Sequence, residues 1–207
     1  MKHKQLLVSL DLDETLIYTE DKYYRVPSLE RKDPDMFTDD DEPVFFRPGV
    51  KDFIKTLKEN EDLKIGVFTA SQPHYANPIL EELFGDLKGF SHLFHQDRVT
   101  IREKIIYEPY NNGPKHEVLK DLKKVLKATG HDIKRTVAVD DKMLYQRQRG
   151  NVLLLPAYGA EKEDTELEKI QDSILFLLDK ENVRDFIKDF KVDKNIKKRY
   201  TPSSPAF

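Results

Sequence analysis

Four aspartates that follow apolar runs could carry chemistry together. Asp11 and Asp13 come directly after the run at 5–10, and Asp140 and Asp141 follow the run at 135–139. Carboxylates placed together repel one another, and a hard divalent cation such as Mg²⁺, which prefers oxygen ligands, would offset that charge. An aspartate carboxylate can also attack phosphorus and form an aspartyl-phosphate. In extended chain Asp11 and Asp13 would share a face, so that one could be the nucleophile while the other handles protons.

Thr69 and Lys120 could complete such a site. Thr69 follows the apolar run at 64–68 and offers a hydroxyl and backbone N–H groups to phosphate oxygens. Lys120, which we expect on a helix before the third strand, could offset the remaining negative charge. Taken singly, these residues are typical of turns, helix caps and solvated helix faces. Their occurrence together and in order, at the ends of expected strands and helices, indicates such a site more specifically than any of them does alone.

The elements that must position these residues alternate along the chain. Apolar runs at 5–10, 64–68, 135–139 and 151–155 predict four buried strands. Helical patterns lie between and after them, so the chain predicts an α/β fold: an open, mostly parallel sheet flanked by helices. In such folds the site lies beyond the carboxyl ends of the strands, which is where the polar groups stand.

The helices are predicted from their apolar faces and capping residues. One helix carries Val50 and Phe53 on its buried face, and a second begins at Pro73, with Pro78 expected to kink or end its opening segment. Pro114 is predicted to open a long amphipathic helix that Gly130 ends. Two further helical stretches are expected near 163–179 and 181–190.

The remaining segments are predicted to be less regular. Residues 19–46 form an insertion after the first strand, with loops and a small hairpin. Residues 85–113 are expected to be irregular, with a strand near 91–95. We expect one domain over residues 1–190, followed at 191–207 by a basic and then Ser/Pro-rich flexible tail.

Composition excludes several classes of protein. The 207 residues include no cysteine, which rules out thiolate nucleophiles and Cys-ligated zinc. Acidic residues (38) slightly outnumber basic ones (35), so nucleic acid is not an expected partner. The chain has no apolar run long enough for a membrane span and no signal-peptide cleavage region, so no membrane partner is expected. We expect an intracellular protein, cytoplasmic or nuclear.

The motifs resemble those of a known family. DLDETLIYT at 11–19 resembles the DxDx[TV] motif of the haloacid-dehalogenase (HAD) superfamily. It is closer still to the form found in FCP/SCP-type phosphatases, the NLI-interacting-factor-like family that acts on the C-terminal domain (CTD) of RNA polymerase II. The resemblance runs from about 5 to 178 and includes four further segments: FRPGVKDFI (46–54), VFTASQPHYANPI (67–79), LKDL (119–122) and VAVDDKML (137–144).

The resemblance implies a HAD-type Rossmann-like fold and a Mg²⁺-dependent phosphomonoesterase. By this resemblance Asp11 is the nucleophile, and Asp13 protonates the leaving oxygen and then activates water. The Mg²⁺ ligands would be Asp11, the backbone carbonyl of Asp13, and Asp141, with Asp140 supporting the ion or orienting Lys120. The resemblance further assigns phosphate binding to Thr69, Ala70 and Lys120, and gives Thr15 the task of bracing the first motif.

The candidate substrate contacts match the family pattern less closely than the catalytic motifs do. Tyr75 matches a tyrosine that lines the substrate groove of the family, and Tyr23 and Tyr24 in the insertion are further candidates. His95 occupies the place of an arginine that reads the peptide, with Arg98 nearby. Where the small CTD phosphatases form an apolar pocket for a substrate proline, this chain has polar residues, Asp21 and Gln72.

Three functions remain open from the sequence. The first is a Mg²⁺-dependent phosphoserine/phosphothreonine protein phosphatase that acts through an aspartyl-phosphate on a phosphorylated protein or peptide, with CTD-like substrates as one option. The short insertion favours it. The alternatives are a HAD phosphatase of a small metabolite or nucleotide, and a non-catalytic phosphoprotein-binding module.

The end of the chain suggests a further partner. Residues 200–206 read YTPSSPA, close to the polymerase II heptad YSPTSPS. We therefore expect possible self-docking of the tail 200–206.

Overall fold

The computed structural model describes residues 5–20, 33–106, 113–145 and 147–187, with only the backbone described for 103–106 and 113–117. In these ranges no helix is long and apolar enough to cross a membrane. The strands are β1 (Leu6–Leu10), β2 (Ile17–Thr19), β3 (Met36–Phe37), β4 (Pro43–Phe46), β5 (Leu63–Phe68), β6 (Leu93–Phe94), β7 (Thr100–Ile106), β8 (Gly113–Leu119), β9 (Thr136–Asp140) and β10 (Val152–Leu154). The α-helices are α1 (Val50–Glu59), α2 (Pro73–Phe84), α3 (Leu122–Thr129) and α4 (Glu166–Leu177), and short 3₁₀ turns span 87–89, 96–98, 133–135, 149–151 and 183–185.

The central sheet has five parallel strands in the order β10-β9-β1-β5-β6. β1 lies in the middle, with β5 on one side and β9 on the other, and all five of its residues are buried. A parallel strand covered on both faces needs apolar residues at successive positions, which explains the unbroken run in the sequence. The four predicted strands correspond to β1, β5, β9 and β10.

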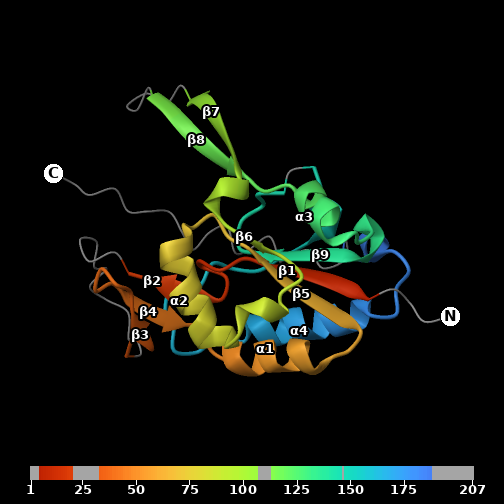
Figure 1. Cartoon of the computed structure of the whole chain (residues 1–207), viewed down its shortest axis with the longest axis horizontal. Helices are drawn as coiled ribbons and strands as arrows, with labels where there is room; N and C mark the ends of the chain where they lie inside the picture. Colours follow the sequence, from red (N-terminus) through yellow and green to blue (C-terminus); the bar gives the residue numbers. More distant parts are fainter. Residues whose placement is uncertain (1–4, 21–32, 107–112, 146, 188–207) are drawn as a thin grey trace.

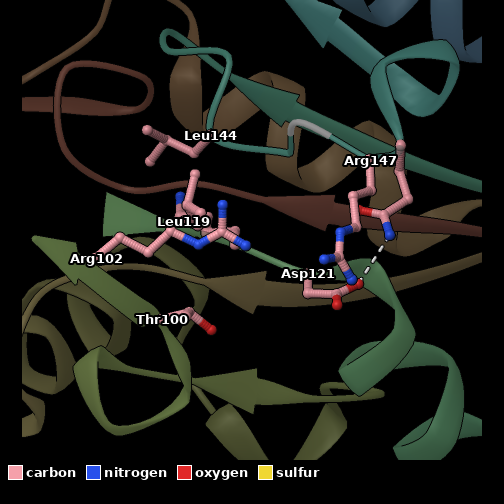
Figure 2. Close-up of a pocket in the computed structure, with 8 residues that line it drawn as sticks. Thr100, Arg102, Leu119, Asp121, Leu144 and Arg147 are labelled. Carbon is pink, nitrogen blue, oxygen red and sulfur yellow. Dashed lines mark hydrogen bonds between the residues drawn. The ribbon is translucent and has the colours of Figure 1, made fainter. Parts of the chain in front are cut away.

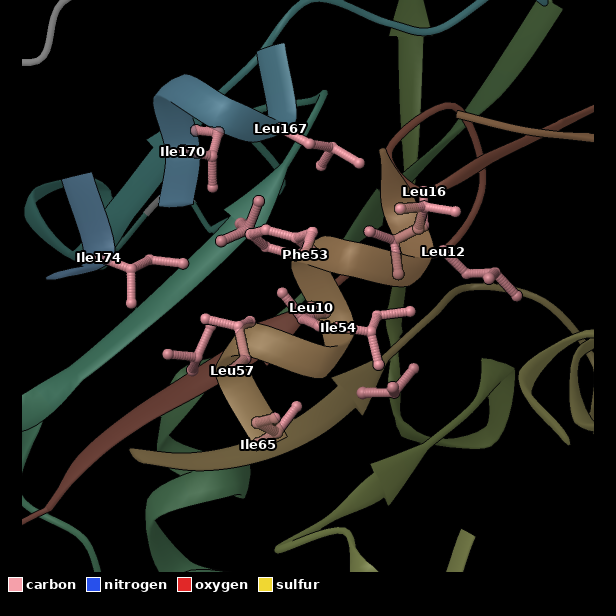
Figure 3. Packing of buried hydrophobic residues seen from close by; sticks show 14 of the residues in the cluster. Leu10, Leu12, Leu16, Phe53, Ile54, Leu57, Ile65, Leu167, Ile170 and Ile174 are labelled. Carbon is pink, nitrogen blue, oxygen red and sulfur yellow. The ribbon is translucent and has the colours of Figure 1, made fainter. Parts of the chain in front are cut away.

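Helices cover both faces of this sheet (Figure 1). Successive strand residues point to opposite faces. On one face Leu10 of β1 and Ile65 of β5 pack in the cluster that includes α1, α2 and α4, and Figure 3 shows α1 lying over them beside α4. On the other face Leu7 packs with Leu122 of α3. The predicted α/β class, an open parallel sheet flanked by helices, is confirmed.

The insertion forms a small antiparallel sheet in the order β2-β4-β3. Ile17 of β2 pairs with Phe46 of β4, so the sheet begins a few residues after β1 ends. The predicted insertion after the first strand, with its small hairpin, is therefore confirmed for the residues described. Residues 21–32, which include Asp21, Tyr23 and Tyr24, lie outside the described ranges.

The segment before α3 differs from the prediction. Residues 113–119 form β8, which pairs antiparallel with β7, and this hairpin projects away from the sheet (Figure 1). The helix begins only at Leu122, where the Asp121 side chain accepts a hydrogen bond from the Lys123 backbone N–H and caps it. The helical spacing of Leu119, Leu122 and Leu126 made the predicted helix begin too early. In the structure the Asp121 cap sets the start of the helix at Leu122. Lys120 therefore lies in the turn between β8 and α3, and 85–113 is more regular than predicted.

Two other helix predictions can be compared with the structure, which shows that Pro78 does not end α2. α2 continues through Pro78 to Phe84, although proline removes one backbone donor, since its buried face carries five apolar side chains. Of the stretch 181–190, residues 183–185 form a 3₁₀ turn instead of an α-helix. Residues 188–190 and the tail 191–207, with the expected self-docking segment, lie outside the described ranges.

Candidate active site

The sheet topology brings the predicted site residues to one edge. β1, β5 and β9 are adjacent and parallel, so the residues that end or follow them meet at their carboxyl ends. Asp11 follows β1, and its backbone N–H donates to the Val139 carbonyl of β9 at 2.9 Å. Thr69 follows β5, and Asp140 is the last residue of β9.

Lys120 joins two of the aspartates. Its Nζ lies 2.6 Å from Asp11 Oδ1 and 2.8 Å from Asp140 Oδ2, and its side chain has no exposed surface. The Lys120 backbone N–H donates to the Leu144 carbonyl, which fixes this turn against the loop after β9. Burial alone would lower the pKa of Lys120, but the carboxylates of Asp11 and Asp140 raise it. The lysine is therefore held as a cation between two carboxyl groups.

One cation does not balance the carboxylates. Burial, with the nearby charges of Asp140 and Asp13, raises the pKa of Asp11 to about 8 even though Lys120 opposes the rise. Burial likewise raises the pKa of Asp141 to about 6. Ionised carboxyl groups in this position need further positive charge.

Three of these residues form an acidic cluster that could hold a cation. Oxygen atoms of Asp11, Asp140 and Asp141 lie within 4.8 Å of one another. Asp141 Oδ2 is buried and accepts no hydrogen bond among the described residues, and Lys142 Nζ lies 3.6 Å from it. Asp140 is already engaged, because Lys120 contacts one of its oxygens and the Lys142 backbone N–H donates to the other. Carboxylate oxygens alone form the donor set, which suits Mg²⁺.

Asp13 lies on a different wall of the site. Its Oδ2 accepts hydrogen bonds from the hydroxyls of Ser71 (2.7 Å) and Thr69 (3.3 Å), and its Oδ1 accepts one from Tyr75 (2.7 Å). Tyr75 also bonds Thr19 of β2 at 2.6 Å. Burial and the charge of Asp13 raise the pKa of Tyr75, which keeps the phenol protonated. The Asp13 carboxyl is thus held in place by hydroxyl groups instead of cations.

Thr15 and Arg47 fix the loop that carries both aspartates. The Thr15 hydroxyl accepts a bond from the Asp141 N–H at 3.1 Å. Arg47 is almost fully buried, and its guanidinium donates to the Thr15 carbonyl, to the Pro156 carbonyl and to both oxygens of Asp164. One arginine therefore ties the first motif to the segments that follow β10 and precede α4.

An open groove begins at Asp13. It has a volume of about 520 Å³ and is lined by mostly polar residues: Asp13, Thr19, Glu42, Ala70, Ser71, Gln72, His74, Tyr75 and Gln96. A second, smaller recess of about 150 Å³ lies beside Lys120 and is lined in part by Arg102 of β7 (Figure 2). Asp13 lines the groove, and Lys120, which contacts Asp11 and Asp140, lines the recess.

Most of the residues predicted for the site lie in it. Asp11, Asp13, Thr69, Ala70, Lys120, Asp140 and Asp141 surround or adjoin one point, and Tyr75 lines the groove. His95 and Arg98 line neither of the two cavities. The His95 ring bonds the Asn77 side chain, and Arg98 pairs with Asp97.

Sequence reasoning missed Ser71, Thr19 and Arg102. Ser71 stood in the matched segment VFTASQPHYANPI without a role, although its spacing of two from Thr69 suggested a shared loop. Thr19 and Arg102 come from small antiparallel sheets whose register the sequence did not predict.

Comparisons with known proteins relate this chain to a phosphatase family. A model of the NLI interacting factor-like phosphatase family matches residues 6–185. A curated relative from Dictyostelium discoideum, named "Probable C-terminal domain small phosphatase", is 29% identical over 176 residues. That match covers 84% of this chain and 51% of the relative, so the chain spans about half the relative's length.

Solved structures show a related fold at low identity. A crystal structure of an uncharacterized Listeria monocytogenes protein matches with a TM-score of 0.52 at 16% identity, over 83% of this chain and 98% of that one. The fission yeast RNA polymerase II CTD phosphatase Fcp1, bound to beryllium fluoride, matches with a TM-score of 0.48 at 15% identity, over 90% of this chain and 54% of that one. The extent of the family match decides the assignment: this chain belongs to the NLI interacting factor-like phosphatase family.

Proposed function

We propose that the protein is a phosphoserine/phosphothreonine protein phosphatase that uses Mg²⁺ and forms an aspartyl-phosphate on Asp11. The observation that carries the proposal is the pair of aspartates on one loop with different surroundings. Asp11 faces Lys120 and the other carboxylates, whereas Asp13 faces three hydroxyl groups. Groups with such different partners suit different roles in one reaction.

The proposed reaction has two steps. A carboxylate oxygen of Asp11 attacks phosphorus while the bond from phosphorus to the serine or threonine oxygen breaks, and Asp13 gives its proton to that leaving oxygen. Water then attacks the phosphorus of the aspartyl-phosphate, Asp13 takes the proton from the water, and inorganic phosphate leaves with Asp11 restored. Asp13 lines the groove, so a leaving group bound there would lie beside its carboxyl group.

Other residues hold the phosphoryl group and its charge. Lys120 supplies a fixed cation beside the attacking oxygen. The Thr69 hydroxyl, which donates to Asp13 in this structure, would turn to a phosphoryl oxygen when substrate binds, and the Ala70 backbone would bind another. Asp11, Asp141 and Asp140 would hold Mg²⁺, with the Asp13 carbonyl as an expected further ligand. The bound ion would offset charge between the carboxylates and the phosphoryl group.

The shape of the site supports a protein substrate. The groove at Asp13 is wide and open, and the described part of the insertion contributes Thr19 and Glu42 to its lining. A phosphorylated side chain on a peptide can enter such a groove without a lid having to move. The name of the Dictyostelium relative also points to a phosphatase of this kind.

The test compares substrates under one set of conditions. We expect Mg²⁺-dependent release of phosphate from an aryl phosphate and from phosphoserine or phosphothreonine peptides, abolished by EDTA and by Asp11→Asn. A small-metabolite panel measured in parallel distinguishes the two enzyme hypotheses. Faster turnover of a metabolite than of any peptide contradicts the proposed substrate class, and EDTA-resistant turnover contradicts the mechanism. Phosphopeptide binding without turnover of any substrate would indicate the non-catalytic module.

A further inference from the structure

The recess beside Lys120 brings together two arginines from distant parts of the chain. Arg102 belongs to β7, and Arg147 lies in the loop between β9 and β10. Figure 2 shows the two side chains reaching into the recess from opposite sides, with Leu119 and Leu144 forming part of the wall. The register of the hairpin, in which Thr100 pairs with Leu119, puts Thr100 and Arg102 on the face that lines the recess.

Neither arginine has a described partner that would explain its position in the recess. Both are exposed, and neither forms an ion pair or hydrogen bond with any residue that the structure describes. Two guanidinium groups that repel each other gain nothing from sharing a recess unless an anion lies between them.

The acidic residue of the recess does not fill that role. Asp121 Oδ1 accepts hydrogen bonds from the Gln148 side chain (2.8 Å) and the Lys123 backbone N–H (2.9 Å), so this carboxylate caps α3. Lys120, the remaining charged residue of the lining, is balanced by Asp11 and Asp140. The net charge of the recess is therefore positive.

Lys120 connects the recess with the proposed phosphoryl site, because it contributes to both. Lys120 lines the recess while its Nζ contacts Asp11 Oδ1 at 2.6 Å. A water molecule occupies about 30 Å³ in the liquid, so a space of about 150 Å³ can hold a small anionic group with some water.

We propose that the recess formed by Arg102 and Arg147 binds a second anionic group of the substrate, beside the phosphoryl group that Asp11 attacks. This inference rests on the proposed function and narrows its substrate class to phosphopeptides that carry another phosphate or an acidic side chain near the reacting residue. Arginine binds phosphate in a bidentate manner and carboxylate in a similar way, so both sources of the anion are allowed.

Binding of non-hydrolysable peptides tests the subsite without depending on turnover. Each peptide carries one phosphonate analogue of phosphoserine and, at one to four positions on either side, a second phosphonate, an aspartate or an alanine. Dissociation constants for the wild-type protein with Mg²⁺ are measured by calorimetry. At one or more spacings we expect the second phosphonate to tighten binding about tenfold over alanine, and aspartate to tighten it less.

Substitutions then locate the effect. In Arg102→Gln and Arg147→Gln we expect the ratio of dissociation constants between the alanine and doubly charged peptides to fall to about one, and Arg147→Lys to keep part of it. Arg149→Gln is the matched control, because it removes the same charge from an exposed arginine outside the recess. Equal affinity for all peptides, a ratio that survives both recess substitutions, or a ratio that Arg149→Gln also abolishes would overturn the proposal. Turnover of the singly phosphorylated peptide, measured separately, decides the proposed function itself.

Discussion

Lys120 is the residue on which the arrangement of the carboxylates most depends. It is the cation that contacts both Asp11 and Asp140, and its side chain is fully buried. Removing one partner from a buried ionic group leaves the others uncompensated, which costs about 3–5 kcal/mol. The same residue supplies charge to the proposed phosphoryl site, so structure and catalysis share it.

Substitution of Lys120 should therefore affect stability and activity together. We expect Lys120→Met to lower the free energy of unfolding by about 3 kcal/mol and to reduce kcat about a hundredfold or more. Urea unfolding and steady-state turnover of an aryl phosphate measure the two effects. Lys127→Met is the control on the neighbouring helix α3, because Lys127 is exposed. Near-normal stability of Lys120→Met would show that the carboxylates do not need this cation.

Asp141 offers a test of the cation site that does not use activity. Its Oδ2 is buried and accepts no hydrogen bond from the part of the chain that the structure describes, so a divalent ion should bind there and stabilise the folded chain. We expect millimolar Mg²⁺ to raise the melting temperature of the wild-type protein by several degrees, and to raise that of Asp141→Asn much less. Thermal unfolding with Mg²⁺ and with EDTA measures the difference. An equal shift in both proteins would place the bound ion elsewhere.

Tyr75 is expected to act on the reaction through Asp13. Its hydroxyl donates to Asp13 Oδ1 and bonds Thr19 of the insertion sheet. Hydrogen bonds to charged groups contribute about 1.5–3 kcal/mol, so Tyr75→Phe should lower kcat on a phosphoserine peptide about tenfold. Thr19→Val, which loosens only the tyrosine, should have a smaller effect of the same kind. A wild-type kcat for Tyr75→Phe would remove this tyrosine from the positioning of Asp13.

At the scale of elements, Arg47 holds the reactive loop to the rest of the fold. It connects the end of β4 with Thr15, Pro156 and Asp164, four segments that are distant in sequence. Asp164 in turn accepts the Glu166 backbone N–H at the start of α4. Through this arginine the position of the first motif depends on how α4 is docked.

Arg47 donates to both carboxylate oxygens of Asp164, and we expect lysine to be a poor substitute for it. Lysine keeps the charge but cannot contact both oxygens of Asp164 and two carbonyls at once. We expect Arg47→Lys to lower the free energy of unfolding by about 3 kcal/mol and to reduce turnover as the Thr15 loop loosens. A double-mutant cycle with Asp164→Asn, followed by urea unfolding, should show strong coupling. Additive effects of the two substitutions would mean that the pair contributes little.

The elements also show where sequence reasoning succeeds. The buried strands β1, β5 and β9 were predictable because residues covered on both faces give unbroken apolar runs, and parallel pairing then placed Asp11, Thr69 and Asp140 together. The hairpin β7–β8 was not predictable, since its residues have no apolar face that a period could reveal. For that reason Arg102, which this hairpin carries into the recess, was not among the residues predicted from the sequence.

At the scale of the whole molecule, a buried histidine beside the central sheet should make the free energy of unfolding depend on pH. The His92 ring packs against Gly66 of β5. A Cβ added at Gly66 would come within 2.1 Å of the ring, so glycine is needed there for the close approach. The ring bonds Ser9 of β1 at 2.9 Å and Ser91 at 3.1 Å, and its exposed fraction is 5%. Burial, with a smaller contribution from His131, lowers the pKa of His92 to about 4.

The sign of the pH dependence follows from that shift. An unfolded chain binds a proton at His92 below a pH of about 6.5, whereas the folded chain does not until about 4. Stability from the neutral, buried ring is therefore complete above pH 6.5 and is lost as the pH falls towards 4. The shift corresponds to about 3 kcal/mol at most.

Substitution of His92 should remove this part of the acid sensitivity. We expect the free energy of unfolding of the wild-type protein to fall steeply between pH 6.5 and 4.5, and that of His92→Gln to fall less, because glutamine does not titrate. His92→Gln should also be less stable at pH 7, since it fits the space beside Gly66 less well. Exposed His74 provides the control, and His74→Gln should keep the wild-type slope. Urea unfolding at a series of pH values measures all three proteins, and identical slopes would assign the acid sensitivity to other groups.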